Sequence, residues 1–432
     1  MVKAGKRSSR RRPAGVAWGA VCADDAGNFW DNPELGGLAR TVGGIREPRP
    51  EEMAPLPEGS TLQFLPGRLP LVKGAQGIEV AEDCCVLAAL LPSGWTRTLL
   101  PAWEKAEGAP DLPIFGYTAV FSHEGELWVA ATRTEDNPHW RPKRYGRDDL
   151  PKLIRRTERE FSRNRLYKHL EKCALEYGCY NAQNIFYGRW EGAAPTSPAC
   201  NAGCLGCISY QPKDMPPSPQ VRLKFTPTAQ EIADIGIRHL ANPQAIYSFG
   251  QGCEGEPLLQ APLIAESIKL MRAATSAGAI HMNTNGSRPE AAQMVIEAGL
   301  DSMRVSMNSA VPSSYNAYYR PSAYKMENVL ETIRLARQAG VWVSINWLCL
   351  PGFNDSEEET EAMIRLVKDL DINMIQMRNL NMDPDLLLPD LPAPKGKELG
   401  VVTLLERLHR EVPQLVVGNH NPFTPRRGEV AG

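Results

Sequence analysis

The segment Cys200-Asn-Ala-Gly-Cys204-Leu-Gly-Cys207 carries three cysteines in Cys-x3-Cys-x2-Cys spacing. Because the loop between them contains glycine, the three thiols can turn toward one common centre. Three thiolates are one fewer than the four that structural zinc sites and fully ligated iron–sulfur clusters use. The spacing therefore predicts a metal centre that keeps one coordination position for a cofactor or a substrate.

Apolar, β-rich runs alternate with amphipathic helical segments around and after this loop. Two of the helical segments begin with capping boxes, Thr228 with Glu231 and Ser356 with Glu359. Six β-α units in succession predict a parallel sheet with helices outside it, which binds its ligands at the C-terminal ends of the strands. The expected strands are Asn184–Arg189, Ala245–Phe249, Ala279–Asn283, Met303–Met307, Val341–Leu348 and Asn373–Met377, and the expected helices are 228–241, 260–277, 287–298, 325–339 and 356–369.

Polar segments follow three of these strands. The second strand ends in Gly250-Gln-Gly-Cys-Glu-Gly-Glu-Pro257, where exposed backbone carbonyls and the Glu256 carboxylate would accept hydrogen bonds from an ammonium group. The third ends in His281-Met-Asn-Thr-Asn-Gly286 and the fourth is Arg304-Val-Ser-Met-Asn308. Each side chain alone is equally typical of loop capping. Their occurrence at successive strand ends favours one shared polar ligand.

A second motif, Glu254-Gly255-Glu256-Pro257, lies at a predicted strand end, with Glu256 49 residues after Cys207. Together with the cysteine spacing, this motif resembles the radical S-adenosylmethionine (radical SAM) enzymes. The resemblance covers residues 183–385 and implies a partial (β/α)6 barrel. It implies that Cys200, Cys204 and Cys207 hold a 4Fe–4S cluster whose fourth iron binds SAM. Reductive cleavage of SAM then gives a 5′-deoxyadenosyl radical, which abstracts hydrogen from a substrate.

The resemblance also implies a set of cofactor-binding residues at the strand ends. Gly206 stands where the family often has an aromatic residue, Glu254 where it has glycine, and Asn308 where aspartate is common. Gln376 and Arg378 lie two apart on one strand and so share a face. The residues expected to contact SAM are Glu254, Gly255, Glu256, Pro257, Thr284, Asn285, Ser306, Asn308, Arg320, Gln376 and Arg378.

Two further cysteines, Cys253 and Cys349, lie near predicted strand ends and are the candidate catalytic residues. Either thiol would donate a hydrogen atom or hold a substrate covalently, and the alternative is a buried, inert cysteine. An alternative for the cysteine loop is a zinc site completed by Cys173, Cys179 or a histidine.

The remainder of the chain is expected to form other regions. Residues 1–14 read as a basic flexible arm rather than a signal peptide, and 15–145 as a separate, mostly β domain with a hairpin that joins Tyr117–Phe121 to Leu127–Ala130. Residues 146–182 read as a basic linker with one amphipathic helix over 149–177. The core, 183–385, follows this linker. Residues 386–432 are expected to form a C-terminal helix and a flexible tail.

Composition limits the partners. The formal net charge is −2, and no apolar run is long enough to span a membrane. Ten cysteines dispersed over 432 residues favour a reducing cytoplasm over a secreted disulfide scaffold. Between Arg141 and Lys168 there are eleven Lys or Arg against four Asp or Glu, which is typical of a solvated helix face or, alternatively, of an RNA-binding surface. Nothing in the sequence indicates DNA binding.

The sequence thus predicts a radical SAM enzyme, an oxidoreductase or a transferase, that draws electrons from a reductant such as flavodoxin or ferredoxin. The large N-terminal domain and the basic linker favour a macromolecular substrate, a peptide, a protein or RNA. The alternatives are an enzyme like the radical SAM RNA methyltransferases, and a metal-binding or cluster-binding module without turnover that binds RNA or senses redox state.

Overall fold

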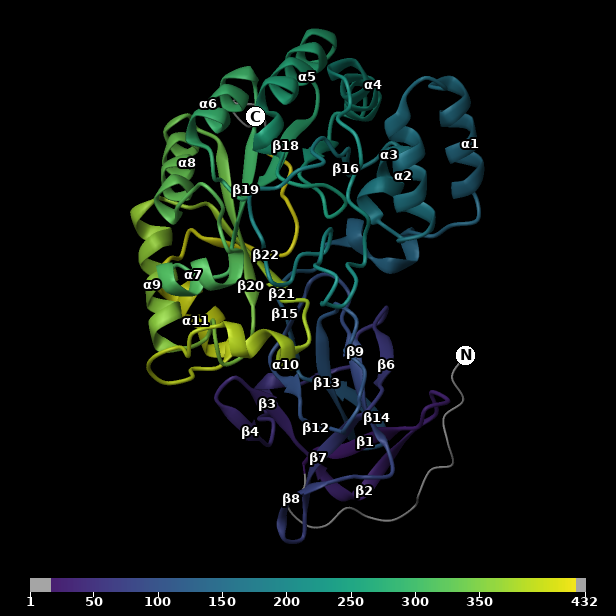
Figure 1. Cartoon of the computed structure of the whole chain (residues 1–432), viewed down its shortest axis with the longest axis vertical. Coiled ribbons are helices and arrows are strands. Elements are labelled where there is room, and N and C mark those ends of the chain that lie inside the picture. The colour runs from purple at the N-terminus through teal and green to yellow at the C-terminus, as the bar shows by residue number, and fades with distance from the viewer. Residues whose placement is uncertain (1–16, 425–432) are drawn as a thin grey trace. The chain divides into compact units, whose positions relative to one another are not determined.

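The computed structural model describes residues 17–424 and divides the chain into two compact units (Figure 1). Unit 1 contains the N-terminal region up to Asp136 together with Leu348–Ile364 and Met377–Pro413. Unit 2 contains Asn137–Trp347, Arg365–Gln376 and the segment from Gln414 onward. The predicted basic arm and the end of the predicted tail lie outside the described residues. Within 17–424, no helix is long and apolar enough to cross a membrane.

Unit 1 is built mainly from short antiparallel strands. The largest sheet has the order β12-β7-β2-β1-β9-β13-β14-β5, with β6 on β9 and β8 on β7. The predicted hairpin is confirmed, since Val120 pairs with Val129 and Phe121 with Trp128. The strands are β1 (Gly19–Ala23), β2 (Phe29–Gly37), β3 (Ala39–Thr41), β4 (Gly44–Arg46), β5 (Ala54–Pro55), β6 (Thr61–Leu65), β7 (Arg68–Gly74), β8 (Gly77–Val80), β9 (Cys85–Leu90), β10 (Trp95–Arg97), β11 (Leu100–Pro101), β12 (Trp103–Lys105), β13 (Tyr117–His123), β14 (Glu126–Val129) and β15 (Ala131–Arg133).

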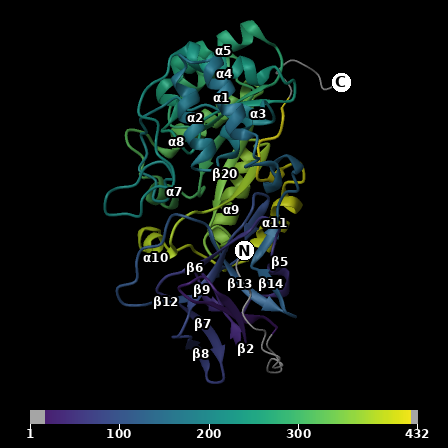
Figure 2. The same cartoon turned by 90° about the vertical axis from the view of Figure 1, so that its right-hand side faces the viewer.

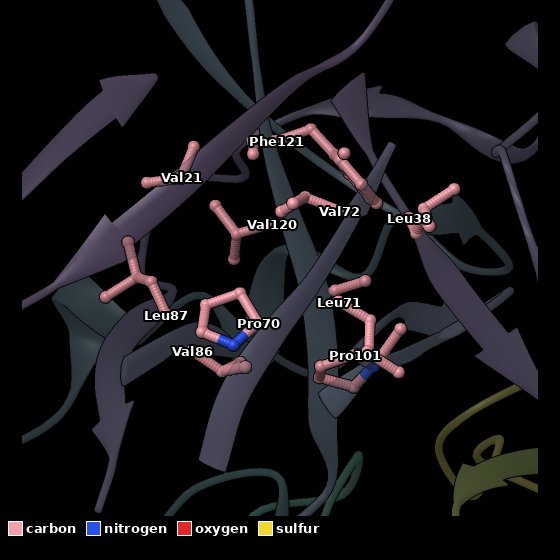
Figure 3. Close-up of a pocket in the computed structure, with 14 residues that line it drawn as sticks. Val21, Leu38, Pro70, Leu71, Val72, Val86, Leu87, Pro101, Val120 and Phe121 are labelled. Atoms are coloured by element: carbon pink, nitrogen blue, oxygen red, sulfur yellow. The ribbon is translucent and has the colours of Figure 1, made fainter. Parts of the chain in front are cut away.

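Apolar side chains fill the space between these strands. Figure 3 shows a gap that Val21, Leu87, Val120 and other apolar residues line. Its volume is about 30 Å³, room for at most about two water molecules. We interpret it as a packing defect rather than as a ligand site.

Two downstream segments complete unit 1. They contribute the helices α10 (Pro384–Leu387) and α11 (Val401–Glu411). Asp383, which caps α10, forms an ion pair of 2.7 Å with Arg68 of β7, and both side chains are fully buried. A buried pair of this kind fixes the downstream segment against the N-terminal strands, because separating the charges would leave each one uncompensated.

Unit 2 contains most of a curled, parallel half-barrel sheet. The predicted fold class is confirmed, since the core is a partial barrel of parallel strands with helices and the N-terminal region is separate and mostly β. The strand order β16-β17-β18-β19-β20-β21-β22 follows the order of the chain, and the helices α5, α6 and α8 form an arc along one side of β18–β20 (Figure 1). The strands are β16 (Glu191–Ala193), β17 (Ile246–Phe249), β18 (Ala279–Thr284), β19 (Ser302–Met307), β20 (Trp342–Cys349), β21 (Met374–Asn379) and β22 (Val416–Gly418). The helices are α1 (Leu150–Glu160), α2 (Arg165–Leu175), α3 (Tyr180–Tyr187), α4 (Ala229–Leu240), α5 (Ala261–Ala274), α6 (Pro289–Ala298), α7 (Pro312–Tyr319), α8 (Met326–Gln338) and α9 (Glu357–Asp369), the last of which crosses between the units.

The two faces of the sheet differ in polarity, because side chains alternate along each strand. Val305 of β19 faces α8, where a Cβ on Gly286 would meet both Val305 and Val329. The residues on the opposite face of β19 and β20 are polar: Arg304 pairs in register with Ser344, and Ser306 with Asn346. The apolar face therefore packs on helices, and the other face lines the interior of the half-barrel.

Three expectations about the elements were wrong. The single helix over 149–177 is two helices, because Asn164 accepts a hydrogen bond from the Leu166 N–H (3.1 Å) and so begins α2 anew. The expected strand Asn184–Arg189 is the helix α3, which ends at Gly188 in the left-handed conformation (φ 64°). The sheet also has a seventh strand, β22, within the region expected to be a helix and a flexible tail. Figure 2 shows α1, α2 and α3 lying together beside α4.

Candidate active site

The cysteine loop follows β16 and is fixed by backbone hydrogen bonds to the end of α7, a helix that the sequence did not predict. The N–H groups of Gly203 and Leu205 donate to the carbonyls of Tyr319 and Tyr318, both at 3.0 Å. The Ser322 N–H donates to the carbonyl of Asn201 (2.9 Å). These contacts hold the loop in shape independently of any metal.

The three cysteines of this loop are half-buried, and their thiols influence one another electrostatically. Burial, followed by the Cys207 and Cys200 thiols, raises the pKa of Cys204 well above its usual value. Burial, followed by the Glu256 carboxylate, raises the pKa of Cys200 to about 11. One cation is near, since Arg222 Nη2 lies 3.9 Å from Cys207 Sγ. Ligation would have to displace the thiol protons, which only a strongly thiophilic metal centre can do.

The spacing of the sulfurs distinguishes between two kinds of metal centre. Among residues 17–424, the only three His, Cys, Asp or Glu side chains whose ligand atoms all lie within 4.8 Å of one another are elsewhere, so the loop sulfurs are farther apart than this. A single zinc ion draws its thiolates together at about 2.3 Å from one point. A polynuclear cluster spreads them, because each thiolate binds a different iron atom. Loop sulfurs that are not gathered around one point are compatible with the cluster.

The turn after β17 lies directly against the cysteine loop. Glu254 is buried and accepts hydrogen bonds from the backbone N–H groups of Thr196, Ser197, Gly250 and Gln251 and from the Thr196 hydroxyl, at 2.6–3.0 Å. The Gly255 N–H donates to the Ser197 carbonyl (2.7 Å), and a Cβ at Gly255 would lie 1.9 Å from the Ala199 oxygen. Glycine is therefore required at 255 by close backbone approach, and Glu254 organises the turn.

Glu256 connects this turn to the end of β18. Its carboxylate accepts hydrogen bonds from the Thr284 hydroxyl, from the Asn285 N–H (2.8 Å) and from the Leu258 N–H (3.0 Å). Burial raises the pKa of Glu256 to about 7, although these hydrogen bonds oppose the shift. Pro257 occupies the first position of the short 3-10 helix that Glu256 caps.

The end of β18 also contacts the cysteine loop through side chains. Asn285 donates to the Asn201 side-chain oxygen (2.8 Å), and Asn201 donates to the Ser287 hydroxyl (2.9 Å). On the next strand, Asn308 is buried and donates to the Ser314 carbonyl (3.3 Å), while Ser306 is half-buried beside Asn346. The structure thus brings together the predicted residues Glu256, Thr284 and Asn285 with the loop.

A chain of polar contacts crosses the interior of the half-barrel. Arg304 donates to the Gln376 oxygen (2.9 Å), Gln376 donates to Asn421 (2.6 Å), and Asn421 donates to Glu191 (2.8 Å). The Ser248 hydroxyl also donates to Glu191 (2.7 Å). Gln376 is fully buried and takes part in this chain of contacts.

The other predicted residues lie in different surroundings. Arg320 is exposed and ends α7 in the left-handed conformation (φ 45°). Cys349 and Arg378 belong to unit 1, where burial raises the pKa of Cys349 to about 12. Cys253 is buried next to Cys173 and His169 rather than in the cysteine loop.

Comparison with known families identifies this segment. Residues 194–364, which contain the cysteine loop and the strand ends described above, match the model of the Radical SAM superfamily. The chain carries a radical SAM domain. This domain covers β17–β20 and the helices between them. The resemblance to the radical SAM enzymes that the sequence analysis found is therefore confirmed.

Two curated proteins are similar to part of the chain. The chain is 26% identical over 195 residues to the uncharacterized protein MJ0808 of Methanocaldococcus jannaschii, covering 45% of this chain and 53% of that protein. It is 31% identical over 124 residues to the GTP 3′,8-cyclase of Petrotoga mobilis, covering 28% and 38%. The chain thus spans about half the length, or less, of these curated relatives.

Solved structures with some similarity include the [FeFe]-hydrogenase maturase HydG, with 14% identity, a TM-score of 0.39, and coverage of 63% of this chain and 66% of that one. A radical SAM methyltransferase from Sphaerobacter thermophilus has 16% identity, a TM-score of 0.38, and coverage of 55% and 70%.

The residues of the radical SAM domain fit the cofactors of this family, a 4Fe–4S cluster and SAM. Three thiolates are the ligands that a cluster of this kind uses, and they leave one coordination position for SAM. Three buried polar atoms have no hydrogen-bond partner within the described protein: Gln251 Nε2 in the turn after β17, and Ser344 Oγ and Asn346 Oδ1 on the interior face of β20. Buried polar groups normally have partners, so these atoms indicate a polar ligand.

Several residues of this site escaped the sequence analysis. Asn201, Ser344, Asn346 and Glu191 all face the site, but none stands in a recognisable motif. The alternation of Arg304 and Ser306 with apolar neighbours was a usable signal for β19, and Ser344 and Asn346 show the same period on β20.

Proposed function

We propose that the chain is an enzyme that reductively cleaves SAM and uses the product to abstract a hydrogen atom from a substrate. The cluster bound by Cys200, Cys204 and Cys207, together with SAM, would supply a 5′-deoxyadenosyl radical. The observation that carries the proposal is the convergence of the cysteine loop, the turn after β17 and the end of β18, which are joined by the contacts of Asn201 and Glu256.

The protein's own residues would hold SAM in a fixed pose. The turn that Glu254 organises exposes backbone carbonyls beside the cysteine loop, and these would accept hydrogen bonds from the ammonium group of SAM. Asn285, Ser306 and Asn308 provide polar groups for its carboxylate and ribose. Arg320, which is exposed at the edge of the same loop, would pair with an anionic group of SAM or of the substrate.

The interior polar face supports a polar substrate, and unit 2 offers a surface on which a large one would dock. Helix α1 presents Arg155, Arg156 and Arg159 to solvent. We propose a macromolecular substrate, either RNA or a peptide, and a flavodoxin or ferredoxin as electron donor in a reducing cytoplasm. Charge reversal at these three arginines would then weaken substrate binding in a salt-dependent way if the substrate is RNA. Unchanged binding would exclude RNA docking on this face.

The function is tested under anaerobic conditions. The protein is reconstituted with iron and sulfide, SAM and a strong reductant are added, and 5′-deoxyadenosine is measured. We expect the wild type and Cys22→Ala, a buried cysteine of β1, to form 5′-deoxyadenosine, and Cys204→Ala to form none. A fully loaded cluster that does not cleave SAM would overturn the proposal and favour a metal-binding module. A methylated product would favour the methyltransferase alternative over simple hydrogen abstraction.

A further inference from the structure

A second group of metal-ligating side chains lies outside the cysteine loop. The ligand atoms of His169, Cys173 and Cys253 all lie within 4.8 Å of one another. For three atoms this close, there is a point within about 2.8 Å of each, near the distances of about 2.0–2.3 Å at which zinc binds nitrogen and sulfur. No function described above uses these three side chains together.

The helix α2 places two of the ligands. His169 and Cys173 are four residues apart, so their side chains lie on the same face of α2 one turn from each other. Cys253 comes from the turn after β17, which carries Glu254 and Glu256. Its carbonyl accepts a hydrogen bond of 2.7 Å from the Leu223 N–H, so its backbone is fixed. Two segments 80 residues apart in sequence therefore present ligands to one point.

The histidine is free to bind a metal. The Nε2 atom of His169 is buried and has no hydrogen-bond partner within the described protein. A buried polar nitrogen without a partner is unfavourable, whereas a metal ion would satisfy it. This second observation indicates a ligand at the same point as the cluster of side chains.

Cys179 is the candidate for a fourth ligand, and its sulfur lies outside the group of atoms that are within 4.8 Å of one another. Cys179 caps the start of α3, and its N–H donates to the Cys173 carbonyl (2.9 Å), so the Cys173–Cys179 segment folds back on itself. Three thiolates and one histidine are a common ligand set of structural zinc sites.

We propose that His169, Cys173 and Cys253, with Cys179 as the fourth ligand, bind one zinc ion that is separate from the centre in the cysteine loop. The ion would join α2 and the start of α3 to the turn after β17. It would thereby brace the turn that Glu254 and Glu256 organise, without taking part in the chemistry. This assignment gives Cys253 a metal-binding role in place of the catalytic role predicted from the sequence.

The test measures metal content rather than activity. The protein is purified under anaerobic, reducing conditions without added metal, and zinc and iron are measured in the wild type and in the triple variant Cys200→Ala/Cys204→Ala/Cys207→Ala. We expect about one zinc per chain in both, and iron only in the wild type. Zinc that disappears with the triple variant would overturn the proposal, because it would then belong to the cysteine loop.

Single substitutions locate the ion. Cys173→Ser and Cys253→Ser are expected to lower zinc at least tenfold and to leave the iron content after reconstitution above half of the wild-type value. Cys22→Ala serves as the matched control and should keep its zinc. If the serine variants are insoluble, cobalt substitution of the triple variant, which lacks the thiols of the cysteine loop, provides an independent measurement, since cobalt thiolate sites absorb strongly in the near ultraviolet and visible range. Absence of such a band from the triple variant, or a Cys173–Cys253 disulfide in freshly lysed cells, would contradict the zinc site.

Discussion

The hydroxyl of Thr284 donates a hydrogen bond to the carboxylate of Glu256, which joins the end of β18 to the turn after β17. The Asn285 N–H binds the other oxygen of the same carboxylate at 2.8 Å. Glu256 is only 3% exposed, so these bonds form away from water. A carboxylate thus positions two strand ends of the radical SAM domain against each other.

The buried Glu256 predicts a pH dependence of stability. Burial raises its pKa from 4.5 to about 7, so the folded protein binds a proton that the unfolded chain has released between these two values. Since the folded state binds more protons there, the free energy of unfolding falls as the pH rises from about 4.5 to 7. Glu256→Gln removes this titration. The fall between pH 5 and pH 8 should shrink by about 3 kcal/mol at most, the equivalent of the shift in pKa.

The measurement is unfolding by denaturant at pH 5 and at pH 8, followed by tryptophan fluorescence. The exposed Glu297 of α6 provides the control, and Glu297→Gln should leave the pH dependence unchanged. Equal pH dependence in the wild type and in Glu256→Gln would show that the carboxyl group is not titrated in this range.

Close backbone approach at Gly255 predicts a specific loss of metal binding. A Cβ there would lie 1.9 Å from the oxygen of Ala199, next to Cys200. Gly255→Ala must therefore displace the cysteine loop, at a cost of about 1–3 kcal/mol. We expect at least a twofold loss of iron per chain after anaerobic reconstitution. Gly203→Ala lies within the loop itself but meets only Arg320 at 3.7 Å, an ordinary contact, and should bind iron normally. Similar iron contents in both variants would contradict this steric account.

The repeating units of the sheet were predictable because each strand and helix of the radical SAM domain has a strong period. The expected runs at 245–249, 279–283 and 303–307 correspond to β17, β18 and β19, and the capping box of Thr228 and Glu231 starts α4. Asn184–Arg189 was misread as a strand, because a short apolar run such as Ile185-Phe186-Tyr187 has no decisive period. Gly188, which follows it, was the signal for a helix end.

The site was predictable only where the residues stand in motifs. Cys200, Cys204, Cys207 and Glu256 could be found from their spacing. The group of His169, Cys173 and Cys253 could not, because one member is far away in sequence and only the fold brings it close. The strand β22 was missed for the same reason: three residues carry no period, and they become a strand only by pairing with β21.

The break between α1 and α2 predicts a cost for removing Asn164. Its side chain accepts the Leu166 N–H (3.1 Å) and donates to the Glu231 carbonyl (2.7 Å), so it both caps α2 and attaches it to α4. Asn164→Ala should destabilise unit 2 by about 1–3 kcal/mol, the sum of a lost cap and a buried unpaired carbonyl. Thermal unfolding compares this variant with Arg163→Ala, an exposed neighbour that should change the midpoint by less than about 1 °C. A similar shift in both would contradict the capping role.

The buried ion pair of Arg68 and Asp383 predicts strong coupling between two distant segments of unit 1. Asp383→Ala leaves the fully buried Arg68 guanidinium without its counter-charge, although Arg68 still donates to the Pro110 carbonyl at 2.8 Å. We expect Asp383→Ala to lower the free energy of unfolding by about 3–5 kcal/mol. The double variant Arg68→Met/Asp383→Ala should recover part of this loss, because the double variant also removes the unpaired charge. The exposed pair of Lys105 and Asp111 is the control, and Asp111→Ala should cost less than about 1 kcal/mol. Chemical denaturation of the wild type, Asp383→Ala, Arg68→Met and the double variant gives the coupling free energy directly. If the double variant is no more stable than Asp383→Ala, the loss comes from the cap that Asp383 provides to α10 rather than from the stranded charge of Arg68.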